Sequence, residues 1–373
     1  MKKLFVILTA FALLVCIRIY CFAEEDLYSG VYEQSGIKKT EDYLTDGARE
    51  FLREENIDTS DYNWINSLTA EGVFSHIWKF IKSGAKAPLK AGSAVMGIII
   101  IAAAVRAFGN GEEADTAVKF AVTLAVCSAF IYSVFASVSS AVNAIKGCSA
   151  FMLAFIPAYM GIVSVSGAPA TAVSSGVMML ASAEFVNATV AFFITSVMGA
   201  YLALSVGAAV SPLVSGTGIA ETFKKAGIWI MSFCTTVFLG LLGAKNAVNS
   251  AADSLSVKTA RFILGTCVPV AGNALSGAVN TVSSSLSLLR SSVGIYGVVA
   301  IVIMLLPVLA ELLLWRLILN LLGGVCTLFS IDETSKLFKA VDGMLGFLTG
   351  AVILTAAMFT VSLAITLGAG KAV

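Results

Sequence analysis

Long runs of apolar residues dominate the chain from residue 89 to its C-terminus, and they predict helices that cross a membrane. A hydrocarbon core of about 30 Å needs about 20 mostly apolar residues in one helix. Six stretches meet this requirement without interruption: 89–108, 117–140, 185–210, 226–244, 294–322 and 343–367. The pattern therefore predicts six transmembrane helices.

Two further apolar stretches are interrupted by proline and glycine. Residues 148–170 contain Pro157 and Gly167, and residues 262–282 contain Pro269 and Gly277. Each is a kinked span or a re-entrant segment, because non-helical backbone at membrane depth must be buried in protein or face a water-filled cavity. Counts of Lys and Arg near the span ends do not decide whether these stretches cross the membrane or re-enter it. Under either topology, the loop after the first span and the segment near Lys336 face the cytoplasm.

The N-terminus has the layout of a secretory signal peptide. Basic Lys2 and Lys3 precede an apolar stretch, and Cys21-Phe22-Ala23 offers small residues at the cleavage positions. We expect residues 1–23 to be removed after Ala23. Arg18 keeps an uncleaved anchor open as the alternative, and in both cases Glu24 starts on the extracytoplasmic side.

Residues 24–88 form a polar extracytoplasmic segment. From Glu24 to Lys90 the chain has 8 basic and 13 acidic residues, whereas from residue 91 to the end it has 13 and 10. Within it, apolar residues recur at helical spacing over 73–82 beside a face with lysines and His76. This pattern predicts an amphipathic helix at the lipid headgroups, or alternatively a small packed ectodomain helix.

Composition narrows the class of protein. The chain is 58% hydrophobic and 13% charged, with a mean hydropathy of +0.91 and a net charge of +1. An ordinary soluble domain has about a quarter charged residues, so a soluble enzyme and a nucleic-acid binder are excluded. One histidine and seven cysteines without C-x-x-C spacing indicate no metal site. We expect no cofactor and no enzymatic activity.

The two interrupted stretches resemble each other. Ser166-Gly167-Ala168 recurs 110 residues later as Ser276-Gly277-Ala278, and Pro157 recurs 112 residues later as Pro269. Such matches at nearly one offset predict an internal repeat over 117–225 and 226–340. The first helix and its loop (89–116) precede the repeats, and the final helix and tail (341–373) follow them. The copies are inverted if the interrupted stretches cross the membrane, and parallel if they do not.

The repeated segments supply one set of candidate site residues. Paired Gly/Pro-interrupted segments often mark a substrate path in transporters. Small hydroxyl residues equally serve close packing between membrane helices, and both interpretations stay open. The candidates are Pro157, Ser166, Gly167, Thr171 and Ser174 in the first copy, and Pro269, Ser276, Gly277, Thr281 and Ser284 in the second.

Two carboxylates are further candidates because charged groups inside membrane helices are costly and usually functional. Glu311 lies well inside 294–322, and Arg316, five residues on, is a poor helical partner that can extend to the interface. Glu184 opens the 185–210 span, where the helix dipole also favours an acidic residue.

The layout as a whole resembles the stage III sporulation protein AE family of endospore-forming bacteria. The segments that carry this resemblance are Phe155-Ile156-Pro157-Ala158-Tyr159-Met160-Gly161 and Ser166 to Thr171. It implies an all-α, multi-pass protein of the mother-cell membrane that surrounds the forespore. It also implies a permease-like or structural subunit of the transport complex that joins the two cells and sustains late forespore gene expression.

The same resemblance implies the partners. They are a cytoplasmic ATPase, ring-forming membrane proteins and a forespore protein met in the intermembrane space, besides membrane lipid and without nucleic acid. It carries over no catalytic residue. The alternative function is a stand-alone secondary transporter that uses the repeated Pro/Gly segments as its substrate path.

Overall fold

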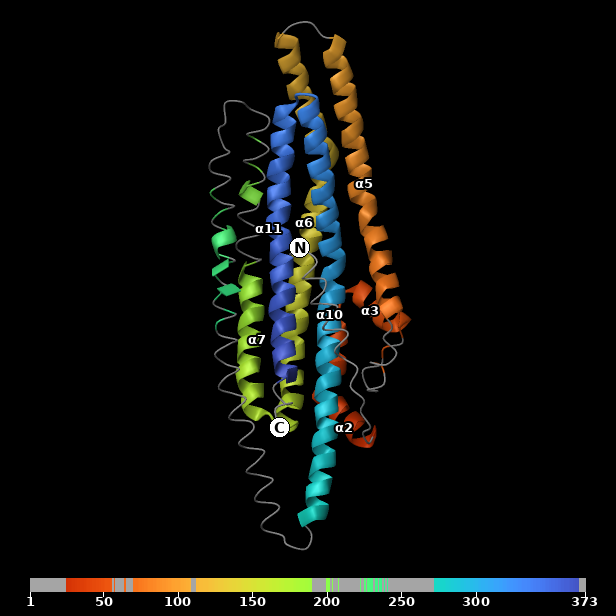
Figure 1. Ribbon diagram of the computed structural model, residues 1–373, viewed down its shortest axis with the longest axis vertical. Helices are drawn as coiled ribbons and strands as arrows, with labels where there is room; N and C mark the ends of the chain where they lie inside the picture. The colour runs from red at the N-terminus through yellow and green to blue at the C-terminus, as the bar shows by residue number, and fades with distance from the viewer. Residues whose placement is uncertain are drawn as a thin grey trace.

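The computed structural model describes residues 25–55, 70–108, 112–189 and 272–368, with Ile57, Trp64 and short helical pieces between 199 and 240. Within these residues every regular element is a helix (Figure 1). The elements are α2 (Glu25–Ser35), the 3₁₀ helix η1 (Ile37–Tyr43), α3 (Asp46–Glu54), α5 (Ala70–Phe108), α6 (Glu112–Val165), α7 (Pro169–Thr189), α10 (Gly272–Leu328) and α11 (Asp332–Gly368). The all-α prediction is confirmed.

Five of the described helices are long and apolar enough to cross a membrane. They comprise Gly84–Phe108, Asp115–Val165, Pro169–Ala188, Leu286–Leu328 and Asp332–Leu367. This confirms a polytopic membrane protein. Residues 1–23, including Ala23, lie outside the described residues, as does Pro269.

One expected boundary between membrane segments is wrong. The predicted span 117–140 and the interrupted stretch 148–170 are mostly one helix, α6, with Pro157 inside it. The intervening residues, from Ala141 to Gly147, include good helix formers and no proline, and the single glycine costs only about 1 kcal/mol relative to alanine. Pro157 lies on the exposed side of α6, while Phe155 and Tyr159 on either side are fully buried, and their packing opposes the cost of the proline.

The break instead comes at Gly167. The N–H of Ala168 donates to Val163 O and the N–H of Gly167 to Ser164 O, both at 3.3 Å, and Gly167 has φ of 90°. This pairing ends α6 in a Schellman motif, whose left-handed position favours glycine. Pro169 then begins α7, as a proline at the first helical position favours.

A second tight turn joins α10 to α11. The N–H of Ile331 donates to Cys326 O at 2.9 Å, and Ser330 has a positive φ of 55°. The predicted spans 294–322 and 343–367 lie in α10 and α11. Figure 1 places this turn and the α5–α6 connection at the same end of the bundle. That agrees with the expectation that both face the same side of the membrane.

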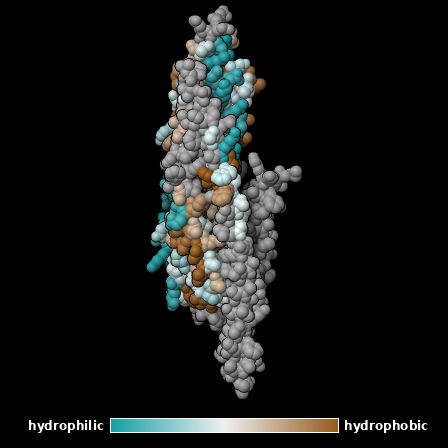
Figure 2. Space-filling model, turned by 90° about the vertical axis from the view of Figure 1, so that its left-hand side faces the viewer, coloured by the Kyte–Doolittle hydropathy of each residue, from teal (hydrophilic) through white to brown (hydrophobic). Residues whose placement is uncertain are grey.

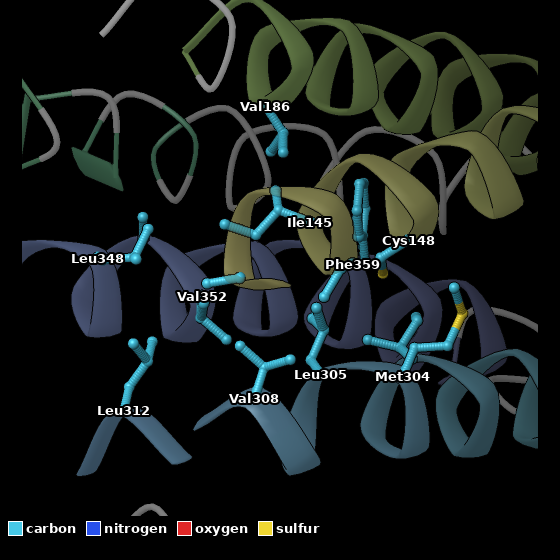
Figure 3. Packing of buried hydrophobic residues seen from close by; sticks show 14 of the residues in the cluster. Ile145, Cys148, Val186, Met304, Leu305, Val308, Leu312, Leu348, Val352 and Phe359 are labelled. Atoms are coloured by element: carbon cyan, nitrogen blue, oxygen red, sulfur yellow. The ribbon is translucent and has the colours of Figure 1, made fainter. Parts of the chain in front are cut away.

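The core runs between α6, α10 and α11. Ile145 and Cys148 of α6, Leu305 of α10 and Val352 and Phe359 of α11 pack together there (Figure 3). The polar N-terminal segment joins the same cluster, because Tyr32, Ile37, Phe51 and Trp64 are also buried in it. We call α2, η1 and α3 the N-terminal lobe.

Candidate functional site

Glu311, one of the predicted intramembrane charges, belongs to a polar cluster between α6 and α10. The Ser137 hydroxyl donates to Glu311 Oε1, and Trp315 Nε1 donates to Ser137 Oγ at 2.8 Å. Trp315 is fully buried and Ser137 is nearly so. Ser137 therefore links the carboxylate to the indole, and we call these three residues the carboxylate cluster.

The local structure explains why these side chains meet. Glu311 and Trp315 are four residues apart on α10, so they share one helix face. Ser137 of α6 is small enough to bring the two helices together. A Cβ at Gly84 would lie 3.7 Å from Glu311 Cβ, so α5 also passes at this height. The cluster thus joins α6 to α10 at the height where α5 passes close to Glu311.

Arg316 pairs with a residue that the sequence analysis did not select. Its Nε lies 2.9 Å from Asp342 Oδ1 on α11, with both side chains partly exposed. The guanidinium lies over Gly346, where a Cβ would be 3.2 Å from Arg316 Cζ. Glu311 and Arg316 therefore have separate partners. The spacing of Glu311 and Trp315 could have indicated the first contact, but no local signal indicates Asp342.

A buried arginine was also missed. Arg290 of α10 is 3% exposed, and its guanidinium donates to Thr366 O near the C-terminal end of α11. Carbonyl groups in the last turn of a helix have no partner within it, and the helix dipole is negative there. Arg290 thus stabilises the end of α11.

The candidate residues of the first repeat copy lie around the turn between α6 and α7. Ser166 Oγ donates to Val163 O and Ser174 Oγ to Ala170 O, both at 2.8 Å. Thr171 is buried at 1% exposure. In the described structure, the two serines satisfy backbone carbonyls, which favours a packing role over a water-lined path.

The candidates of the second copy have a different backbone setting. Ser276, Gly277, Thr281 and Ser284 lie inside α10, in a stretch where the structure describes the backbone alone. Gly167 ends a helix, whereas Gly277 continues one. The internal repeat therefore stays a prediction.

Glu184 is exposed on α7, and no described contact joins it to the carboxylate cluster. Among the described residues, no group of three His, Cys, Asp or Glu side chains could hold a metal ion. The chemistry at Glu311 is that of a half-buried carboxylate that accepts a hydroxyl hydrogen bond. It links α10 to α6 through Ser137.

The apolar helices and their packing define an all-α polytopic membrane protein. A family model described as stage III sporulation protein AE matches residues 62–370, and the chain belongs to this family. The match includes the carboxylate cluster and all five apolar helices, but not the N-terminal lobe.

A curated relative, stage III sporulation protein AE of Bacillus subtilis (strain 168), is 26% identical over 237 residues. The alignment covers 60% of this chain and 59% of that relative. No solved structure matches the chain.

Proposed function

We propose that this protein is a permease-like or structural membrane subunit of the sporulation transport complex between mother cell and forespore. In this role it supports late forespore gene expression from the mother-cell membrane that surrounds the forespore. Family membership supports the role in sporulation, and the five apolar helices support the membrane location.

The observation that carries the proposal is a polar strip on α11. From Asp332 to Asp342 the exposed residues are Asp332, Lys336 and Lys339, which we call the lysine face. Thr123 and Thr334 hydroxyls lie 3.0 Å apart, so this part of α11 runs beside the start of α6. Figure 2 shows hydrophilic residues gathered over the upper part of one side of the molecule.

The neighbouring helices expose apolar side chains at the same end. Ile101 of α5, Phe120 of α6 and Leu321 of α10 are each about half exposed or more. Lipid suits these side chains but not lysines held on a membrane helix. A bundle with one charged side suits a subunit that meets another protein there. Two lysines at the end assigned to the cytoplasm would complement an acidic partner surface.

The alternative, a stand-alone secondary transporter, has less support. Thr171 is buried, and Ser174 bonds to its own helix, so neither lines an open path in the described structure. The proposed partners remain the cytoplasmic ATPase, the ring-forming membrane proteins and the forespore protein.

Reversing the lysine face tests the proposal. The variant K336E/K339E, tagged and expressed in a sporulating host without its own family member, should insert into the membrane normally. It should run as a small species on native gels after mild detergent extraction, and spore formation should fall. Lys82 and Lys86 are also exposed, so K82E/K86E is the control with the same charge change. Retention of the large complex by K336E/K339E would refute the proposal.

A further inference from the structure

α6 and α10 are much longer than a membrane is thick. They contain 54 and 57 residues. At about 1.5 Å per residue they extend about 80 and about 85 Å, against a hydrocarbon core of about 30 Å. More than half of each helix must therefore lie outside the hydrocarbon, and the surface residues indicate which half.

The exposed side of α6 changes character near residue 139. Before it, Phe120, Leu124, Tyr132 and Phe135 are exposed. After it, the exposed residues up to 146 are Ser139, Ser140, Asn143 and Lys146. Lys119 and Ser139 are 20 residues apart, or about 30 Å along a helix, which is the thickness of one hydrocarbon core.

The surfaces of the two neighbouring helices also change along their length. α5 exposes Lys86 and Lys90, and beyond them Ile100, Ile101 and Val105. α10 has no exposed residue from 288 to 312, and beyond this stretch it exposes four leucines, with Asn320, Gly324 and Thr327 among them. The leucines are Leu313, Leu317, Leu321 and Leu328.

Contacts place the three changes at one height. Ser137 of α6 meets Glu311 of α10, just before the first exposed leucine. A Cβ at Gly92 of α5 would lie 2.7 Å from Ile318 Cγ2, so Lys90 is also near this height. A polar border therefore crosses α5 and α6 at the height where α10 first exposes leucine side chains.

A second polar border closes the apolar band at the end with the two turns. Arg106 of α5 pairs with Asp115 of α6 and donates to Phe329 O beside the α10–α11 turn. Lys119 Nζ lies 2.8 Å from Asp115 Oδ2. Charged rows therefore bound the apolar band at both ends.

The N-terminal lobe lies beyond the first border. Trp64, ten residues after the end of the lobe in the chain, donates its Nε1 hydrogen to Ser292 Oγ at 2.9 Å, and Ser292 is 19 residues before Glu311, or about 28 Å away along α10. Figure 1 places α2 and α3 beside the lower half of α10. The lobe exposes Lys38, Lys39 and Arg53, which cannot lie in hydrocarbon. This height of the bundle is therefore in water.

We propose that lipid acyl chains cover only one end of the helical bundle. This lipid belt is formed by α5 from Lys90 to Phe108, α6 from Lys119 to Ser139 and α10 from Leu313 to Leu328, and the lysine face of α11 interrupts it. The rest of α6 and α10, all of α7 and the C-terminal half of α11 stand outside the bilayer beside the N-terminal lobe.

The properties of α7 agree with this placement. α7 packs along the second half of α6, where a Cβ at Gly176 would lie 3.0 Å from Met160 Cγ. Among the five apolar helices it has the lowest hydropathy, 1.2, against 2.0 to 2.7 for the others. Glu184, an exposed carboxylate, lies on the same face of α7 as the exposed Val173 and Val177.

Two matched cysteine substitutions test the belt. Ile101 and Val177 are 66% and 65% exposed, so the protein shields the two positions equally. I101C and V177C therefore differ in whether the proposed belt places them in lipid or in water. The full-length chain, with its native cysteines replaced, is treated with a water-soluble maleimide in open membrane fragments that admit the reagent to both sides. V177C should react about tenfold faster than I101C, because the reagent attacks only hydrated thiolate. In detergent the two should become similar.

N143C supplies a second readout on α6 itself, and it should react like V177C. The experiment is repeated with the native cysteines retained, and the reaction of the parent chain is subtracted. This control shows that the result does not depend on replacing the native cysteines. Protection of V177C and N143C to the level of I101C would overturn the proposal, and so would reaction of I101C as fast as V177C.

Discussion

Ser137 of α6 donates a hydrogen bond to the carboxylate of Glu311 on α10, and this bond joins positions 174 residues apart in the chain. Ser137 also accepts the indole hydrogen of Trp315. The hydroxyl is thus both donor and acceptor between two helices that share an apolar core. Its loss would leave two polar groups without this partner.

Substitutions in the carboxylate cluster separate hydrogen bonding from charge. S137A should destabilise the protein by about 1–3 kcal/mol, because the buried Trp315 Nε1 loses its acceptor. E311Q keeps an acceptor for the serine and should change stability little. Thermal unfolding in detergent measures both. If E311Q sporulates fully, the charge has no role in transport; if it is as unstable as S137A, the account of the cluster fails.

Gly297 allows α10 to approach α6 closely. A Cβ there would lie 2.8 Å from Phe155 Cζ and 3.1 Å from Leu363 Cδ1. G297A should therefore destabilise the protein by about 1–3 kcal/mol. Gly324, on the same helix with nothing within 4 Å, provides the control G324A, which should be neutral or slightly stabilising. Equal midpoints of unfolding for the two variants would contradict the close approach.

Gly167 sets the turn between α6 and α7. With φ of 90°, an added side chain is strained, and G167A should cost about 1–2 kcal/mol. The helical Gly161 has open space around its Cα, so G161A is the matched control. Protease cleavage near residue 167 should rise in G167A only. A resistant G167A chain would show that the turn tolerates an ordinary residue.

Lys79 ties α5 to the N-terminal lobe. The Glu54 carboxylate accepts a hydrogen bond from Lys79 Nζ at 2.8 Å and raises the pKa of Lys79 above its ordinary value, with Glu50 adding to the effect. Because the folded-state pKa is raised, the contribution to stability is full below the unfolded lysine pKa of about 10.4 and is lost as pH rises through the folded value.

The exposure of this pair keeps its effect small. K79Q should therefore be slightly less stable than the parent chain at neutral pH, and the difference should vanish in strong alkali. Thermal midpoints in detergent across this range measure it. K82Q is the control, since Lys82 is also an exposed lysine of α5. A difference that grows with pH would have the wrong sign.

Hydropathy alone predicted the fold class and the regions of the long helices, because apolar content is a local property of the chain. It misplaced the helix ends between residues 140 and 185. There Pro157 continues a helix on its exposed side, while Gly167 ends one. The difference depends on what packs against each residue.

The candidate site was predicted only through Glu311. Its partner Ser137 and the Arg316–Asp342 pair depend on which helices lie side by side, and no local pattern carries that information. Trp315, one turn from Glu311, was within reach of helical spacing. Arg290 was missed because its acceptor is a backbone carbonyl near the end of α11.

Arg106 has a mechanical consequence for the whole bundle. It bonds Asp115 near the start of α6 and the carbonyls of Phe329 and Ser330 in the α10–α11 turn. These bonds hold the α5–α6 and α10–α11 hairpins together at the end of the bundle where both turns lie. Any splaying of the hairpins is smallest at Arg106 and grows toward the far end, beside the N-terminal lobe.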